Sequence, residues 1–330
     1  MTTSMNIDPA GTATSPAGFR AAGVTCGIKE SGKPDLAILY SDHDCTAAGV
    51  FTRNQVVAAP VIIDRETLAT NNTHIRGAII NSGNANACTG DPGLANALAM
   101  QQLSAEALNG DANQFLVMST GVIGVQLPME QVEAGIAAAA AELSAEGGMA
   151  AAQAIMTTDT RPKHQSITLE LSGGRVTLGG MAKGAAMIHP NMATLLGIIT
   201  TDAAIAPDRM KPLLRKAVDQ SFNAITVDGD TSTNDTILFL ANGASGVEAS
   251  NEADLALMQD ALLALCQALA KMIVLDAEGA TKFVEVQVTG ALSSTDARQI
   301  ASTIATSPLV KTAFTVADPQ LGTYPDGSRP

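Results

Sequence analysis

The sequence contains no tryptophan, and aromatic residues occupy only 3% of its 330 positions. It also lacks an excess of basic residues, because 19 Lys and Arg stand against 32 Asp and Glu and give a formal net charge of −13. Domains that bind nucleic acids through stacked bases usually have more aromatic side chains and a basic surface. The composition therefore argues against nucleic-acid binding, and it predicts a core built from aliphatic residues and methionine.

Cysteine is scarce too, and the four cysteines show no CxxC pair and no zinc-ligand spacing (Cys26, Cys45, Cys88 and Cys266). Their isolated surroundings indicate reduced thiols that pack as small apolar residues. The N-terminus lacks the basic and apolar regions of a signal peptide, and no apolar run reaches the roughly 18 residues of a membrane span. We therefore expect a cytoplasmic protein.

The chain mixes strand-like and helix-like segments. Helical spacing is found at residues 92–108, 129–156 (interrupted at Gly147 and Gly148), 207–222, 252–274 and 294–307. Strands are expected at 19–29, 36–41, 45–54, 59–64, 75–83, 115–124, 164–171, 174–182, 194–201, 282–291 and 309–317, and on both sides of a polar loop within 224–243. This mixture predicts an α+β fold of stacked helix and mixed-sheet layers. We expect disorder over residues 1–15 and an irregular tail over 319–330, and no linker divides the rest.

Two polar features admit a functional interpretation, and in both a structural interpretation is favoured. The segment "GDTSTND" offers metal-binding oxygens from Asp228, Asp230 and Asp235, but it lacks the Gly and Glu positions of a calcium loop. Asx-type turn bonding is the better interpretation, and we expect no metal. His189 lies close to Thr194 in sequence and could act as a base, although a locally bonded histidine is favoured.

Two glycine junctions follow apolar strands, at "NSGNANACTG" and "STGVIG". A strand that ends in Thr-Gly exposes backbone N–H groups at the end of the sheet. The Thr120 hydroxyl and the Gly121 N–H would suit an oxyanion hole. Most such junctions are simple turns, so each motif alone is weak.

Thr194 stands where a loop of Gly, Pro and Asn gives way to an apolar strand. A threonine at such a junction is usually a ladder residue or a cap. The alternative is an N-terminal nucleophile: the Thr194 hydroxyl attacks the carbonyl of Ala193, and hydrolysis of the resulting ester frees the amine of Thr194. That amine, with a pKa near 8, then serves as the local base.

The motifs taken together resemble the glutamate N-acetyltransferase (ornithine acetyltransferase) family of arginine biosynthesis. They are "NSGNANACTG", "STGVIG", "KGAAMIHPNMATLLGIITTDA" and "SFNAITVDGDTSTNDT", in the order of the family, and the similarity runs from about Gly18 to Asp318. The resemblance implies self-cleavage at Ala193–Thr194 into an α part (residues 16–193) and a β part (194–318) of one N-terminal-nucleophile-like fold. Two such pairs commonly form a heterotetramer.

The resemblance also implies the reaction and its residues. Thr194 takes an acetyl group from N2-acetylornithine, and glutamate accepts it from the acetyl-enzyme; some members also use acetyl-CoA as donor, and no cofactor is implied. Matching positions make Thr120 and Gly121 the oxyanion hole. They assign substrate binding to Thr160, Lys183, Thr194 and Glu278. Lys183 can pair with a carboxylate and Glu278 with an ammonium group, as amino-acid substrates require.

Two departures from the family pattern favour an alternative. Ala186 stands where the family usually has a second glycine, and if that position needs a positive φ, alanine costs about 1 kcal/mol. Relatives also continue for some sixty residues beyond the segment that corresponds to "ADPQLGTYPDGSRP". The alternative is therefore an inactive, uncleaved remnant that binds amino acids or partner chains. A third hypothesis is an aminopeptidase or amidase that uses water as acceptor.

Overall fold

Nine strands form the framework of residues 5–189 and 195–316, which are the residues that the computed structural model describes. They are β1 (Asn6–Asp8), β2 (Phe19–Val24), β3 (Leu36–Phe51), β4 (Ile75–Asn84), β5 (Phe115–Val122), β6 (Lys163–Leu171), β7 (Gly174–Lys183), β8 (Leu196–Thr201) and β9 (Thr236–Ala241). Hydrogen bonds join them in the order β1-β6-β7-β8-β9-β3-β4-β5, and β2 pairs with β3. The sheet is mixed, because β4–β5 and β8–β9 are parallel pairs among antiparallel ones.

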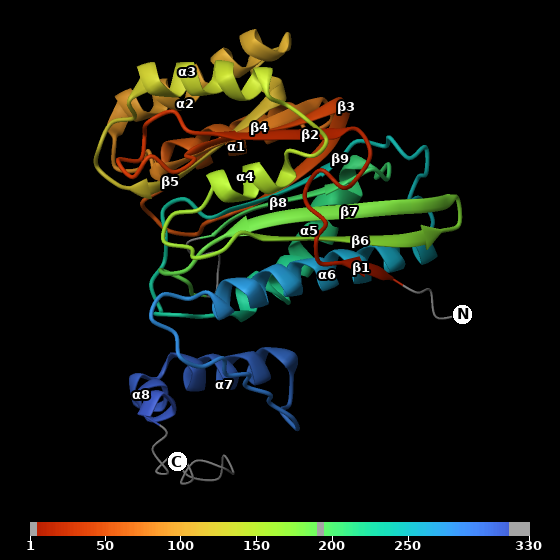
Figure 1. The fold of residues 1–330 in the computed structure, drawn as a ribbon. Coiled ribbons are helices and arrows are strands. Elements are labelled where there is room, and N and C mark those ends of the chain that lie inside the picture. The colour runs from red at the N-terminus through yellow and green to blue at the C-terminus, as the bar shows by residue number, and fades with distance from the viewer. Residues whose placement is uncertain (1–4, 190–194, 317–330) are drawn as a thin grey trace.

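The long strand β3 belongs to two sheet layers. Its first part pairs with β2 and β4, whereas its last part, from Thr46, pairs with β9. The register shifts between Tyr40 and Cys45, and a bulge at such a point bends the strand. Figure 1 shows the result, with β2 to β5 in one layer and β6 to β9 in a second layer beneath it.

Helices cover the outer faces of both layers (Figure 1). The upper layer carries α1 (Ala59–Thr70), α2 (Gly90–Leu108) and α3 (Met129–Ala141), and the lower layer carries α5 (Pro207–Asp219) and α6 (Glu252–Leu275). The short helix α4 (Gly148–Ala154) packs on β2 and β3. The helices α7 (Ser294–Thr306) and α8 (Pro308–Val316) lie apart, below the end of α6.

The central strands are buried on both faces. In β9, Phe239 packs in the core between the lower sheet layer and helices α5 and α6, while Leu238 and Leu240 pack between the two sheet layers. Side chains alternate along a strand, so a strand buried on both faces is apolar on both, as β9 is from Ile237 to Ala241. The predicted α+β fold of stacked helix and mixed-sheet layers is confirmed.

Helix α6 is long and apolar enough, by length and composition, to cross a membrane. Half of its most apolar window is buried inside the fold. Leu262, Leu265 and Leu269 pack in the core of the lower layer, as expected of the core helix of a globular protein.

Several predictions of local structure are wrong. Residues 59–64 belong to helix α1, where Pro60 fits the first turn because its missing N–H is not needed there. Residues 309–316 form α8 instead of a strand. Residues 282–291 form no strand, although polar and apolar side chains alternate along them. The predicted disordered tail is ordered from Met5 onward, because β1 pairs with β6 and Ala13 is fully buried. The predicted tail at 319–330 lies outside the described residues.

Candidate active site

The connection between β7 and β8 is the centre of the candidate site. These strands are antiparallel and Lys183 faces Leu196, so residues 184–195 join their neighbouring ends. The predicted cleavage bond, Ala193–Thr194, belongs to this connection and lies outside the described residues. Because Leu195 is covalently bonded to Thr194, the groups around Leu195 define the surroundings in which the predicted nucleophile would act.

The predicted oxyanion residue Thr120 lies at the end of β5, within reach of Lys183. The Lys183 Nζ donates a hydrogen bond to the Thr120 Oγ1 at 3.3 Å and another to the Thr157 Oγ1 at 2.7 Å. Both Thr120 and Lys183 are buried. A hydroxyl that accepts from an ammonium group keeps its own proton free to donate, so the Thr120 hydroxyl is able to serve a developing oxyanion.

The Lys183 ammonium is almost completely enclosed by protein. Burial lowers its pKa, because the charged form loses its hydration, and the carboxylate of Asp159 opposes this effect. The Asp159 Oδ2 lies 3.9 Å from the Lys183 Nζ. The contacts to Thr120 and Asp159 are long, at 3.3 and 3.9 Å, so the ammonium is able to turn one of its three donors to a further anion such as a substrate carboxylate.

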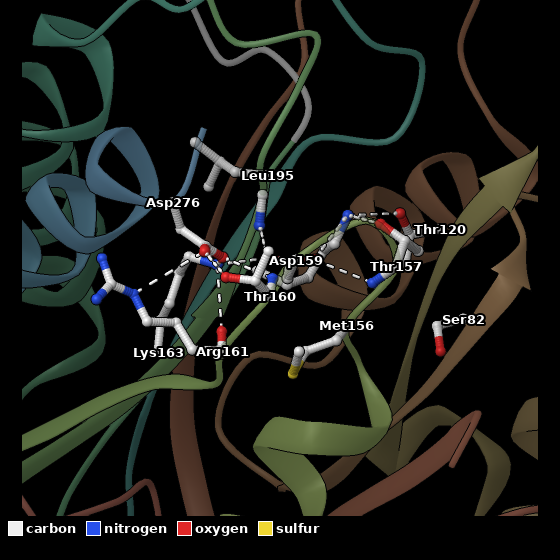
Figure 2. Close-up of polar contacts among 12 residues, drawn as sticks. Ser82, Thr120, Met156, Thr157, Asp159, Thr160, Arg161, Lys163, Leu195 and Asp276 are labelled. Atoms are coloured by element: carbon white, nitrogen blue, oxygen red, sulfur yellow. Dashed lines mark hydrogen bonds and ion pairs between the residues drawn. The ribbon is translucent and has the colours of Figure 1, made fainter. Parts of the chain in front are cut away.

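A second buried lysine ties this site to the end of α6. The Lys163 Nζ lies 2.6 Å from an oxygen of Asp159 and 2.6 Å from an oxygen of Asp276 (Figure 2). Burial raises the pKa of both carboxyl groups, but their lysine partners and hydrogen bonds outweigh it and hold each pKa below its usual range. The Asp159 Oδ1 also accepts the Gly184 N–H at 2.8 Å. The cluster therefore anchors the first residue of the connection.

The remaining predicted substrate residues lie around the same connection. Thr160 donates its backbone N–H to the Asp276 Oδ2 at 3.0 Å, and its hydroxyl also donates to Asp276 (Figure 2). The Glu278 N–H donates to the Ala185 carbonyl oxygen at 2.8 Å, and the Glu278 side chain is exposed. The fold thus brings Thr160 and Glu278 to the end of the sheet that holds Thr120 and Lys183, although 23 to 158 positions separate them in the sequence.

The segment "GDTSTND" bonds to the backbone on both sides of the undescribed residues 190–194. Asp228 accepts the N–H groups of Met187 and Ile188, the latter at 3.0 Å, and also accepts the Asp230 N–H at 3.1 Å. Asp235 accepts the Leu195 N–H at 2.9 Å. The Asx-type bonding favoured from sequence is found between Asp228 and the Asp230 N–H, two positions apart, whereas the bonds to Ile188 and Leu195 each span 40 positions.

His189 lies 3.5 Å, through its Nδ1, from the Thr226 hydroxyl oxygen. This is the local bonding favoured from sequence. Nothing in the described contacts places the ring against Thr120 or Lys183.

Sequence reasoning missed four charged residues of the site (Lys29, Asp159, Lys163 and Asp276). Lys29 donates to the carbonyl oxygens of Pro34 and Met156 at 2.6 and 2.7 Å, and burial lowers its pKa to about 8. Asp159 and Asp276 stand one and two positions from the predicted Thr160 and Glu278. That proximity was the available signal, whereas the convergence of these groups with Lys163 is a property of the fold.

The backbone strain expected at Ala186 is located elsewhere. Met187 has a positive φ, of 57°, and Ala186 does not. Met187 is the positive-φ residue other than glycine in the described part of this connection. The φ of 57° lies in the left-handed region that L-residues adopt at some cost. The cost attributed to alanine in place of glycine at position 186 therefore does not apply.

Gly121 is required by close packing, and its replacement gives a testable effect. Its φ is 138°, and a Cβ there would lie 2.2 Å from the Gly83 carbonyl carbon and 2.4 Å from the Asn84 nitrogen. Gly121→Ala should separate β5 from β4 and lower the free energy of unfolding by about 3 kcal/mol. Urea denaturation measures this. Gly124 is the matched control, with a φ of 76° and nothing within 4 Å.

Gly124→Ala should cost only the backbone strain of about 1 kcal/mol. Equal destabilisation by the two variants would contradict the packing argument for Gly121.

Comparisons with known proteins identify the family. The model of the ArgJ family matches residues 20–324. The chain is 52% identical over 317 residues to the arginine biosynthesis bifunctional protein ArgJ of Symbiobacterium thermophilum, covering 95% of this chain and 78% of that protein. It is 42% identical, with a TM-score of 0.52, to a crystal structure of ornithine acetyltransferase complexed with ornithine from Mycobacterium tuberculosis, covering 57% of this chain and 98% of the solved chain.

A more distant likeness concerns the fold alone. A β-aminopeptidase from a Burkholderia species has a TM-score of 0.51 at 14% identity, covering 80% of this chain and 86% of that chain. The extent of the family match and the identity to the Symbiobacterium protein decide the assignment: the chain belongs to the ArgJ family, the bifunctional acyltransferases of arginine biosynthesis.

Proposed function

We propose that this chain transfers the acetyl group of N2-acetylornithine to glutamate through an acetyl ester on Thr194, after it has cleaved itself between Ala193 and Thr194. The observation that carries the proposal is the contact between Lys183 and Thr120 at 3.3 Å, directly beside the strand end that follows Thr194. An anion-binding ammonium and an oxyanion donor are what acyl transfer between amino acids requires at one place.

The geometry suggests how the residues share the work. The Thr194 hydroxyl attacks the acetyl carbonyl, and the Gly121 N–H and the Thr120 hydroxyl stabilise the negative charge on its oxygen. Ornithine leaves with its amine, and the amine of glutamate then attacks the ester. Both substrates are α-amino acids, so the Lys183 ammonium can hold the carboxylate of each in turn. Thr160 and the exposed Glu278 carboxylate complete the proposed substrate contacts, with Glu278 suited to an ammonium group.

The length of the match to the solved ornithine acetyltransferase chain supports a break near Thr194. The match includes 98% of the solved chain but only 57% of this chain, or about 188 of its 330 residues. A separate chain that ends at residue 193 would have this length. The strands of both parts form one sheet, with β8 between β7 and β9, so the two products would stay together, and we propose pairs of them in a heterotetramer.

The inactive-remnant alternative is weakened by the backbone at Ala186. It was based partly on strain at that residue, and the positive φ falls on Met187 instead. Lys183, Thr120 and Asp159 are also already in contact in the uncleaved chain, so the proposed substrate site does not have to be built after cleavage. Water as the acceptor, the third hypothesis, is distinguished by experiment, because the likeness to the aminopeptidase shows only the fold.

The test combines the mass of the purified chain with an acetyl-transfer assay. We expect two fragments that meet at Ala193–Thr194, and ornithine release from N2-acetylornithine that depends on added glutamate. An intact chain with no transfer would support the remnant, and acetate release without glutamate would support a hydrolase. Acetyl-CoA offered as the donor in a parallel reaction decides whether it replaces N2-acetylornithine.

A further inference from the structure

Lys29 is a second cation beside the candidate site, and the proposed function gives it no role. It is half-buried in the loop between β2 and β3. Its Nζ donates to the carbonyl oxygens of Pro34 and Met156, at 2.6 and 2.7 Å. An ammonium group has three hydrogens to donate, and the described residues give this one neither a third acceptor nor an ion pair. One donor of Lys29 is therefore left for a ligand.

The loop that carries Lys29 is held in place by a buried carboxylate. Asp35 accepts the backbone N–H groups of Cys26, Gly27 and Lys29, at 2.7, 3.1 and 2.9 Å, and its side chain is fully buried. Hydrogen bonds to an ionised group are stronger than those between neutral groups. Three of them fix the backbone of this loop, so the fold sets the position from which the Lys29 side chain extends.

The Lys29 side chain lies against the strand end that carries the proposed oxyanion donor. A Cβ on Gly83 would lie 2.9 Å from the Lys29 Cγ. Gly83 is the register partner of Gly121 in the parallel pair of β4 and β5. The side chain of Lys29 therefore crosses the end of β4, one strand away from Gly121. Because Gly121 is exposed, a small molecule can reach this end of the sheet.

Lys29 and Lys183 form a pair of cations at this place. Thr157, whose hydroxyl accepts from the Lys183 Nζ at 2.7 Å, directly follows Met156, whose carbonyl oxygen accepts from Lys29. Burial is the main cause that lowers the pKa of Lys29 to about 8, and the charge of Lys183 adds to it. Lys29 thus keeps its charge at neutral pH. Two ammonium groups on neighbouring residues of an acidic chain suit a ligand that carries two negative charges.

We propose that Lys29 binds the side-chain carboxylate of glutamate while Lys183 holds its α-carboxylate, so that Lys29 selects the acceptor. The inference rests on the proposed function, in which glutamate accepts the acetyl group. Four C–C bonds join the two carboxyl carbons of glutamate, which lie about 5 Å apart when the chain is extended. A ligand of that length is able to reach two cations that are held on adjacent residues.

The donor differs from the acceptor at this end of the molecule. N2-Acetylornithine shares the α-carboxylate, but its side chain ends in an ammonium group, which Lys29 would repel. The exposed Glu278 carboxylate suits that group instead. The two half-reactions should therefore share Lys183 and differ in their need for Lys29.

The first experiment measures kcat/KM separately for the donor and the acceptor, because each reports one half of a ping-pong reaction. Lys29→Met removes the charge and keeps the length of the side chain. It should lower kcat/KM for glutamate by about 10- to 100-fold, mainly through KM, and change kcat/KM for N2-acetylornithine by less than about threefold. Lys33→Met is the matched control, since Lys33 is an exposed lysine of the same loop. It should leave both constants within about twofold.

The second experiment needs no turnover, and it compares the binding of glutamate with that of glutamine by isothermal titration. Glutamine has the same shape as glutamate and lacks the side-chain charge. The parent protein should bind glutamate at least about tenfold more tightly than glutamine, Lys29→Met should lose this preference, and Lys29→Arg should keep part of it. If thermal melting shows that Lys29→Met does not fold, Lys29→Gln replaces it, because its amide keeps N–H donors for the two carbonyl oxygens.

The outcomes separate this inference from the proposed function. Equal losses of kcat/KM for donor and acceptor in Lys29→Met would overturn the assignment, because Lys29 would then serve a group that both substrates share. A parent protein that binds glutamate no more tightly than glutamine would overturn it as well. A preference for glutamate that Lys29→Met loses would support the assignment even if the parent released no ornithine, a result that would be a failure of the proposed acetyl transfer alone.

Discussion

Thr194→Ala is expected to leave the chain intact and to reduce acetyl transfer by at least about 10⁴-fold. The variant loses the hydroxyl that is proposed to attack Ala193 during cleavage and the acetyl carbonyl during catalysis. The other proposed substrate residues remain, because Lys183 keeps its contacts with Thr120 and Asp159 without Thr194. Substrate binding should therefore survive while turnover disappears.

The controls for Thr194→Ala use its conservative partner. Thr194→Ser keeps a hydroxyl, so it should still cleave, and its transfer rate should be between a few per cent and some tens of per cent of the parent rate. The Ala variant should show neither cleavage nor transfer. Mass spectrometry gives the cleavage, isothermal titration with N2-acetylornithine gives the binding, and ornithine release gives the turnover. Cleavage or substantial transfer by the Ala variant would contradict the assignment of the nucleophile.

Lys163→Met is expected to produce the largest loss of stability, about 3–5 kcal/mol in the free energy of unfolding at neutral pH. Lys163 lies 2.6 Å from both Asp159 and Asp276, and all three side chains are at most 3% exposed. Methionine has a similar length and no charge. Its introduction leaves two buried carboxylates without their shared cation, although Asp159 keeps Lys183 at 3.9 Å.

The pH dependence gives this prediction a second test. In the parent protein both aspartates have a folded pKa below the usual value, so their contribution to stability is present above about pH 4 and is lost as the pH falls through the folded pKa. In Lys163→Met the two carboxyl groups keep only the more distant Lys183 and Arg161, each at 3.9 Å, so their pKa values should rise and protonation should relieve the loss of the shared cation. The difference between the two proteins should therefore shrink on going from neutral pH towards pH 4.

Lys211 supplies the control for the loss of one positive charge. It is exposed on α5, and Lys211→Met should change stability by less than about 0.5 kcal/mol. Urea denaturation of the three proteins at several pH values makes the comparison. A Lys163→Met protein as stable as Lys211→Met would show that the buried cluster contributes nothing.

The architecture could be predicted because the elements that build it have strong local patterns. Strand β9 is a continuous apolar run bounded by polar turns, and the long helix α6 begins at the side-chain cap that Asn251 provides to the Asp254 N–H. The failures share a physical cause. Residues 282–291 alternate like a strand, but a strand is stable only beside a pairing partner, and a single sequence does not show where such an edge lies.

The site was predictable only in part, for a similar reason. Thr120 and Gly121 follow an apolar strand, and the motifs that surround Thr194 are contiguous, so each could be found in one stretch of sequence. The pairing of Lys163 with Asp276 spans 113 positions. Long-range ion pairs leave no local pattern, because lysines and aspartates are mostly solvated surface residues.

Acetyl transfer through an ester on Thr194 is best tested by the intact mass of the separated fragments after brief incubation with N2-acetylornithine alone. We expect the fragment that begins at Thr194 to gain the mass of one acetyl group, with the modification on Thr194. Addition of glutamate should return the fragment to its original mass as N-acetylglutamate forms. A fragment that never carries an acetyl group while transfer proceeds would contradict the Thr194 ester, because the acetyl group would then pass to glutamate without an enzyme intermediate.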